Sequence, residues 1–330
     1  MHKTILRLSL ALGLALFVVV ILRSGPGQIL AAIGRLTPAQ WLVLLILRAV
    51  YWVLRTFNWK QVFDVFETKR PFGRLFEARL ADNAVGFLTP SAMLGGLPVR
   101  AAMIGGADRR RVFASVVVDK TIEIFTMSFY TVLAMFAAIV LLPMTPAARI
   151  TFGVFIVLAA ALCAVLWIGQ RSGFFGGLFG RLARIGIRPR WVERNGLRIL
   201  DIDTAIAGFY RRHPSPIPPV VALYTLSYLI WAAEIDMSLR FLGAPGLTLI
   251  KSLLVISLGN VALLLPTVPA SLGVYEATNV GVFAVLGWPA GLAVALAVIR
   301  RLLALFWTAV GLGALFWRQR RPPAAGPASG

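Results

Sequence analysis

Several ionisable side chains lie inside apolar stretches of this chain, where each is expected to form an ion pair or to have a functional role. Asp119 and Glu123 are four residues apart, so they share one face of a helix, and Lys120 is three residues from Glu123. Such a polar face can line a cavity and contact a charged headgroup, or it can form ion pairs within one helix. Both interpretations stay open from the sequence.

Two adjacent arginines, Arg300 and Arg301, lie near the middle of the apolar run Trp288–Trp317. Neighbouring residues point about 100° apart around a helix, so at least one guanidinium should face the protein interior. A guanidinium can bind a phosphate group through two parallel hydrogen bonds. The alternative is a structural ion pair with Glu276 or Glu234.

Acidic residues in the apolar run Pro218–Leu242 differ in their local surroundings. Asp236 and Arg240 are four residues apart, with the acid first, which is the favoured order for an ion pair within a helix. Glu234 has no such neighbour. We therefore expect a structural role for the pair and a functional role for Glu234.

Prolines and glycines break two apolar segments, 80–106 and 247–287. The breaking residues are Pro90, Gly95, Gly96 and Pro98 in the first segment, and Pro266, Pro269 and Gly273 in the second. Prolines and paired glycines interrupt a regular helix, and the freed backbone N–H groups can bind an anion. Arg100 follows the first break, and Tyr275 and Glu276 follow the second. A headgroup site beside both breaks is the favoured interpretation, and a simple kink is the alternative.

The composition restricts the class of protein. Of the 330 residues, 59% are hydrophobic and 14% are charged, and the formal net charge is +20. That apolar content excludes a disordered chain and argues against a nucleic-acid-binding domain, despite the positive charge. The single cysteine, Cys163, excludes a disulfide scaffold. Both histidines, His2 and His213, lie outside the apolar runs, and no metal, nucleotide or nucleophile motif is present. We therefore expect no catalytic residue, metal or cofactor.

Apolar runs of about 20 residues are long enough for a helix to cross the bilayer. Six such runs are present, at residues 5–22, 41–57, 112–142, 150–168, 218–242 and 288–317. The sequence thus predicts an all-α polytopic membrane protein with six transmembrane helices and two re-entrant helical hairpins, formed by the broken segments. The alternative makes each broken segment two short full spans.

Positively charged residues set the expected orientation, because Lys and Arg favour the cytoplasmic side of short loops. With the N-terminus inside, the cytoplasmic loops and termini are residues 1–7, 58–79, 106–111, 169–217 and 318–330. They hold 22 Lys and Arg, whereas the external segments hold 3. Both termini are then cytoplasmic, and the order of span, broken segment and span occurs twice in opposite directions. This is the layout of an inverted repeat, as in many transporters.

The expected organisation of the chain follows from these spans. Five parts are predicted: an anchor helix and external loop at 1–40, a first membrane half at 41–168, a basic cytoplasmic loop at 169–217, a second membrane half at 218–317 and a disordered basic tail at 318–330. Within the basic loop, residues 181–212 form either an amphipathic surface helix or a solvated loop.

Three motifs resemble the lysylphosphatidylglycerol synthase transmembrane-region family, also called flippase-like integral membrane proteins, and the resemblance covers residues 40–317. The motifs are PSAMLGGLPVRA at 90–101, VVVDKTIEIF at 116–125 and PTVPASLGVYEA at 266–277. The last motif matches the family pattern Pro-x-x-Pro-Gly-Gly-x-Gly-x-x-Glu except that Ala270 and Ser271 replace two glycines. In the first motif Leu97 stands where the family often has Glu.

The resemblance implies translocation of a polar-headed lipid between leaflets of the bacterial inner membrane. The lipid would be an anionic or aminoacylated phospholipid, or a hopanoid or polyprenyl-type lipid. Larger family members carry a cytosolic synthase domain, which we expect to be absent here. Expected partners are membrane lipids, including anionic phospholipid, and lipid-synthesis enzymes, with no nucleic acid. The residues expected at the headgroup are Arg100, Asp119, Lys120, Glu123, Glu234, Tyr275, Glu276, Arg300 and Arg301.

Two other functions remain open from the sequence. A polytopic lipid-modifying transferase could use Asp119 or Glu123 as its base, although no donor-binding segment is evident. A scaffold for a lipid-synthesis complex would tolerate changes at the charged residues inside the membrane.

Overall fold

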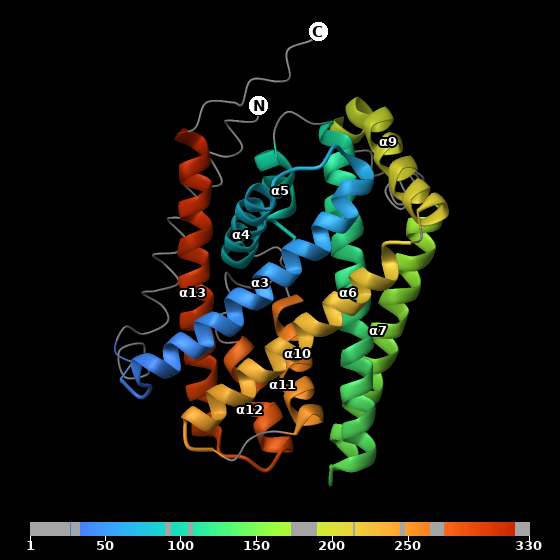
Figure 1. The fold of residues 1–330 in the computed structure, drawn as a ribbon. Coiled ribbons are helices and arrows are strands. Elements are labelled where there is room, and N and C mark those ends of the chain that lie inside the picture. Colours follow the sequence, from blue (N-terminus) through green and yellow to red (C-terminus); the bar gives the residue numbers. More distant parts are fainter. Residues whose placement is uncertain are drawn as a thin grey trace.

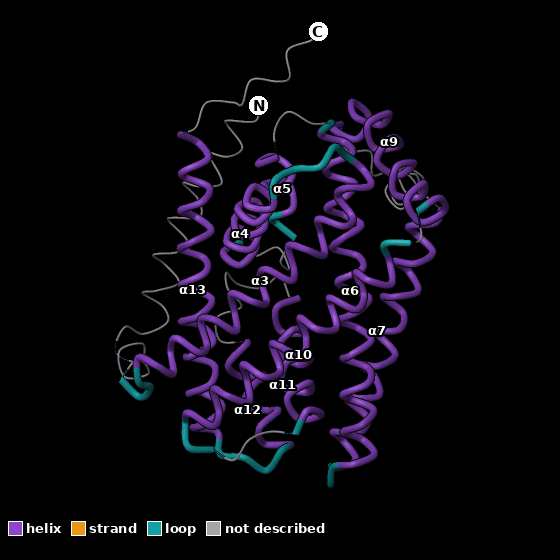
Figure 2. The backbone as a smooth tube through the Cα atoms, viewed as in Figure 1, coloured by secondary structure: helices purple, strands orange, loops and turns teal. Residues whose placement is uncertain are grey.

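The computed structural model describes residues 27, 34–89, 94–104, 108–172, 190–213, 215–244, 248–264 and 274–320. Over these residues the protein is all-helical, and Figure 2 shows helices joined by loops without any strand. The ten helices are α3 (Pro38–Phe66), α4 (Phe72–Leu88), α5 (Leu97–Ile104), α6 (Arg109–Leu141), α7 (Pro146–Ser172), α9 (Arg190–Arg212), α10 (Ile217–Phe241), α11 (Leu249–Leu264), α12 (Val274–Val285) and α13 (Ala290–Arg320).

Five of the described helices, α3, α6, α7, α10 and α13, are long and apolar enough to cross a bilayer. They coincide with five of the six predicted spans. The sixth, at 5–22, lies outside the described residues, and so does most of the tail. The chain is therefore a multi-pass α-helical membrane protein.

Local sequence signals place the starts of two spanning helices. α3 begins with a capping box, in which the Thr37 hydroxyl accepts from the Gln40 amide and the Gln40 side chain accepts from the Thr37 amide at 2.9 Å. Asp108 caps α6 by accepting from the Arg110 amide at 2.9 Å.

The polar stretch 58–79 departs from its predicted state as a loop. α3 continues through residue 66 and α4 begins at Phe72, so most of the stretch is helical. Its polar composition suggested solvent, but Arg79 is buried against other helices. In the predicted basic loop, α9 supplies the helical alternative over Arg190–Arg212.

Two long helices cross at the centre of the molecule, and the other helices pack around them. α3 and α10 pack against each other diagonally across the molecule, and α6 and α13 stand on either side of them (Figure 1). α4 and α5 lie in the upper half of the view, beside the start of α6, whereas α11 and α12 lie in the lower half, beside the start of α13. α7 and α9 pack on the outer side of α6.

Contacts between helices occur in matching pairs. α4 packs on α13 as α11 packs on α6, and α5 contacts α6 as α12 contacts α13. The pairs α3–α4 and α10–α11 correspond in the same way, as do α3–α6 and α10–α13. The set α3 to α6 therefore has the same main neighbours as the set α10 to α13.

The α4–α13 contact depends on a glycine. A Cβ atom on Gly311 would lie 2.2 Å from the carbonyl oxygen of Leu80 and 2.9 Å from Cβ of Ala84. Small residues let membrane helices approach closely, where dispersion contacts stabilise their association. Gly311 thus sets the separation of α13 from α4.

We expect Gly311→Ala to lower the thermal unfolding temperature of the protein in detergent, because the added methyl group meets backbone and costs about 1–3 kcal/mol. Gly313→Ala on the same helix is the matched control, since its Cβ would have nothing within 4 Å. Alanine also favours a helix over glycine, so the control should unfold at the same temperature or higher. Equal unfolding temperatures for the two variants would contradict the close contact.

Candidate functional site

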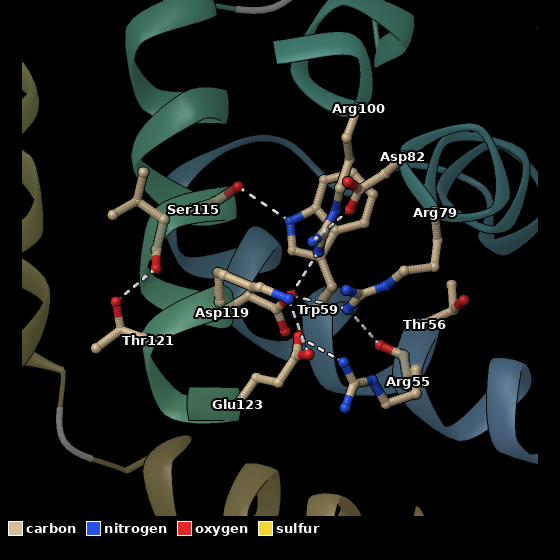
Figure 3. Close-up of polar contacts among 12 residues, drawn as sticks. Arg55, Thr56, Trp59, Arg79, Asp82, Arg100, Ser115, Asp119, Thr121 and Glu123 are labelled. Carbon is tan, nitrogen blue, oxygen red and sulfur yellow. Dashed lines mark hydrogen bonds and ion pairs between the residues drawn. The ribbon is translucent and has the colours of Figure 1, made fainter. Parts of the chain in front are cut away.

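Asp119 on α6 is a fully buried carboxylate that binds two arginines from other helices. Its Oδ2 accepts hydrogen bonds from Nη2 of Arg79 on α4 at 2.8 Å and from Nη2 of Arg100 on α5 at 2.7 Å. Its Oδ1 accepts from the hydroxyl of Tyr224 on α10 at 2.7 Å. Figure 3 shows Arg79 and Arg100 converging on Asp119. One side chain therefore connects α4, α5, α6 and α10.

The turn before α5 brings Arg100 to this position. A Cβ on Gly96 would lie 1.9 Å from the carbonyl oxygen of Asp82, so only glycine allows α5 to fold this closely against α4. The guanidinium carbon of Arg100 then lies 3.8 Å from the centre of the Trp59 ring. Its Nη1 is 3.6 Å from Oδ2 of Asp82. The predicted helix break thus positions a buried cation.

Two further acids bind arginines of α3. Glu123 on α6 pairs with Arg55, and it also accepts from Nζ of Lys120 at 3.0 Å. Glu234 on α10 pairs with Arg48. Arg48 and Arg55 are seven residues apart, so they lie on one face of α3.

A cavity of about 140 Å³ adjoins these ion pairs and is bounded by α3, α4, α6, α10, α12 and α13. Its size is close to that of a cavity that holds benzene, so it can take a group such as a phosphate. The charged lining residues are Arg48, Arg55, Arg79, Asp82, Lys120, Glu123, Arg300 and Arg301. Its aromatic lining residues are Tyr51, Trp52, Phe87, Trp231, Tyr275 and Trp307.

We call the charged lining residues, with their ion-pair partners Arg100, Asp119 and Glu234, the charged cluster. The charged cluster holds seven cations and four acids, a formal excess of three positive charges. Glu276, whose side chain lies outside the described part, would leave the excess positive even if it joined them. Such a surplus favours an anion as the occupant of the cavity.

Arg300 is held by aromatic rings. Its guanidinium carbon lies 4.9 Å from the centre of the Trp231 ring and 5.3 Å from that of Tyr275. Its Nε and Nη1 atoms are buried and have no hydrogen-bond partner among the described residues. The rings fix the guanidinium plane through cation–π contact, and these N–H groups are available to an oxygen acceptor.

The comparison with known families bears on the whole of this arrangement. The family model for the lysylphosphatidylglycerol synthase TM region matches residues 6–313. The chain belongs to this family. The resemblance predicted from the three motifs is therefore confirmed.

Relatives of this family member include two UPF0104 membrane proteins of Methanothermobacter thermautotrophicus. One is 27% identical over 320 residues, which make up 93% of this chain and 93% of the relative. The other is 23% identical over 322 residues, which make up 91% of this chain and 89% of the relative. Both similarities extend over nearly the full length, so the membrane region as a whole is shared.

Most of the predicted headgroup residues of this family member lie together. Lys120, Glu123, Tyr275, Arg300 and Arg301 line the cavity. Arg100, Asp119 and Glu234 lie behind it, each bound to another member of the charged cluster.

The predicted helix breaks are only partly described. Gly95 and Gly96 form a turn before α5, and Pro98 lies in its first turn. Pro90, Pro266, Pro269 and Gly273 lie outside the described residues.

The structure forms the expected Asp236–Arg240 ion pair, and it also forms the ion pair that was one of the two interpretations of Lys120 and Glu123. Lys120 pairs with Glu123, and Arg240 donates through Nε to Oδ2 of Asp236 at 2.8 Å. Glu234, expected to lack a local partner, pairs with Arg48, 186 residues earlier in the chain.

Three cavity arginines were not among the predicted headgroup residues: Arg48, Arg55 and Arg79. The seven-residue spacing of Arg48 and Arg55, with Tyr51 between them, was a usable signal for a polar face of α3. Arg79 gave no such signal, because its segment was assigned to a loop.

We expect Asp119→Asn to destabilise the protein by about 3–5 kcal/mol, because it leaves the buried Arg79 and Arg100 without their shared counter-charge. Thermal unfolding of the purified protein in detergent measures the change. Asp236→Asn is the control, since the partner of Asp236 is exposed and such pairs contribute about 1 kcal/mol or less. If both variants unfold at the temperature of the native protein, Asp119 does not hold these helices together.

Proposed function

We propose that this chain moves a polar-headed lipid between the leaflets of a bacterial inner membrane. The headgroup would occupy the cavity beside the charged cluster while the acyl chains stay in the bilayer. The observation that carries this proposal is the cavity itself. Helices α3, α4, α6, α10, α12 and α13 form its walls, and six cations, two acids and six aromatic residues line it. The family takes its description from the membrane region of a lipid synthase, and this supports a lipid substrate.

The depth of the charged residues supports a site on a lipid path. Asp119 and Arg300 each lie ten residues from the first residue of their helices, α6 and α13. Ten residues of helix rise about 15 Å, which is half of a bilayer core of about 30 Å. α6 and α13 run in opposite directions (Figure 1), and we infer that both residues lie inside the membrane rather than at either surface. A charge facing lipid there would cost about 3 kcal/mol, so these groups belong to an interior site.

We infer an inverted repeat formed by α3 to α6 and α10 to α13. The matching contacts of the two sets support it, and so does their placement of hairpins in opposite halves of the molecule (Figure 1). The cavity has walls from both sets, as expected for a substrate site at a repeat interface. The predicted charge distribution places both termini in the cytoplasm.

We further infer that both hairpins are re-entrant. α5 has 8 residues and α12 has 12, which correspond to about 12 and 18 Å of helix. Each length is short of the roughly 30 Å bilayer core, so neither helix crosses it.

A single-cysteine experiment tests the hairpins. In a Cys163→Ala background we expect Leu94→Cys, in the turn before α5, to resist a membrane-impermeant maleimide applied from outside the cell, because the tip of a re-entrant hairpin stays within the membrane. Thr145→Cys, between α6 and α7, is the control that should react from outside. Labelling of both cysteines at equal rates would instead support full spans.

Neutralising the arginine pair tests transport. We expect Arg300→Gln with Arg301→Gln to abolish protein-dependent exchange of fluorescent phospholipid in liposomes, because the cavity loses two of its six cations. Arg240→Gln is the control, since Arg240 is exposed and pairs with Asp236 away from the cavity. Thermal unfolding in detergent verifies that all variants fold. A native exchange rate in the double variant would overturn the role, and it is the result that a scaffold predicts.

We propose that the lipid is moved without chemical change. Asp119 and Glu123, the residues a transferase would use as base, are each bound to arginines, and an ion-paired carboxylate is a weak proton acceptor. Mass spectrometry of the lipids after the exchange reaction should therefore find them intact. A modified lipid formed by the purified protein would favour the transferase.

A further inference from the structure

We infer that the cavity selects an anionic headgroup whose phosphate offers free oxygen acceptors, and that it discriminates against aminoacylated, cationic headgroups. This inference rests on the proposed function and narrows its substrate. The donors and charges that line the cavity carry it.

The carboxylates of the charged cluster each have a cationic partner. Of the two described acids in the cavity wall, Glu123 pairs with Arg55 and Lys120, and Asp82 lies 3.6 Å from Nη1 of Arg100, which is an ion pair without a hydrogen bond. Behind the wall, Asp119 and Glu234 are bound to arginines as well. An ammonium group that entered the cavity would meet six lining cations. It would find no described carboxylate that lacks a cationic partner. Like charges repel at these distances, so a lysyl or alanyl ester is disfavoured.

The buried polar atoms of the wall that lack a hydrogen-bond partner among the described residues are mostly donors. The carboxylate oxygen among them is Oε2 of Glu123, which is ion-paired with Arg55. Buried lining atoms without a hydrogen-bond partner among the described residues include the indole Nε1 of three tryptophans, the Nε of four arginines, Nη1 of Arg300 and the hydroxyl of Tyr275. The tryptophans are Trp52, Trp231 and Trp307, and the arginines are Arg48, Arg55, Arg79 and Arg300. Indole and guanidinium groups donate and cannot accept.

Buried donors are stabilised by acceptors, and phosphate oxygens are acceptors only. A phosphodiester matches this wall, whereas an amino group would add further donors. Arg300 is the best-placed ligand, because Trp231 and Tyr275 hold its planar fork in one orientation. The cavity of about 140 Å³ has room for a phosphate.

Binding by the full chain in detergent tests this selectivity apart from transport. Short-chain phosphatidylglycerol, lysylphosphatidylglycerol and phosphatidylcholine are titrated separately, and the rise in thermal unfolding temperature reports binding to the folded state. We expect phosphatidylglycerol to reach half of its effect at a concentration at least roughly tenfold lower than either other lipid. Equal or tighter binding of lysylphosphatidylglycerol would overturn the inference, and so would no effect of any lipid.

Two variants identify the groups responsible. Arg300→Lys keeps the positive charge but loses the planar fork, and it should raise the half-effective phosphatidylglycerol concentration roughly tenfold. Trp231→Phe keeps a ring and removes one indole donor, so it should weaken binding in the same direction by a smaller factor. Arg240→Lys, away from the cavity, should bind like the native protein. Unchanged binding in both cavity variants would place the lipid elsewhere and overturn the assignment.

Further measurements distinguish a lipid phosphate from free phosphate, and they distinguish headgroup binding from lipid translocation. Inorganic phosphate alone should not reproduce the effect of the lipid; if it does at equal concentration, the site binds a soluble anion and the lipid assignment fails. Selective binding of phosphatidylglycerol without exchange in liposomes would overturn the proposed translocation and support the inferred selectivity for an anionic headgroup. Exchange that favours lysylphosphatidylglycerol would support translocation and overturn that selectivity.

Discussion

The buried carboxylate of Asp119 holds the position of several helices at once. It accepts hydrogen bonds from Arg79, Arg100 and Tyr224, which come from α4, α5 and α10. At membrane depth water does not compensate a charge, so each of these groups depends on the others for its solvation. These hydrogen bonds therefore restrict the position of the α4–α5 hairpin relative to α6. Because α4 and α6 form part of the cavity wall, they also restrict the shape of that wall.

The members of the charged cluster differ in how they are held in place. Asp119 and Arg100 are fully buried and form an ion pair through Nη2 of Arg100, behind the cavity. Arg300, in the wall, lies against two aromatic rings, and its Nε and Nη1 atoms have no hydrogen-bond partner among the described residues. Rings hold a cation in place without neutralising it, unlike a carboxylate. In the proposed function, this difference leaves Arg300 available to an anion while Arg100 stays bound to Asp119.

The site lies where the two sets of helices meet. α3 supplies two arginines, α6 supplies Lys120 and Glu123, and α13 supplies the adjacent arginine pair, so neither set alone forms the cavity. In the proposed inverted repeat, a rocking of one set against the other would open the cavity to opposite sides in turn. The glycine contacts at Gly96 and Gly311 would then limit which helices can separate, because both bring backbones into direct contact.

The sequence by itself determined five described spans, the breaks near residue 96 and the local ion pairs Lys120–Glu123 and Asp236–Arg240. Each depends on one helix: a span needs enough apolar residues, and a local pair needs only helical spacing. The tertiary structure alone decided that Glu234 binds Arg48 and that Arg79 is a buried ligand of Asp119 rather than a loop residue. Those partners are far apart in the chain, and helix packing, which no local pattern encodes, brings them together.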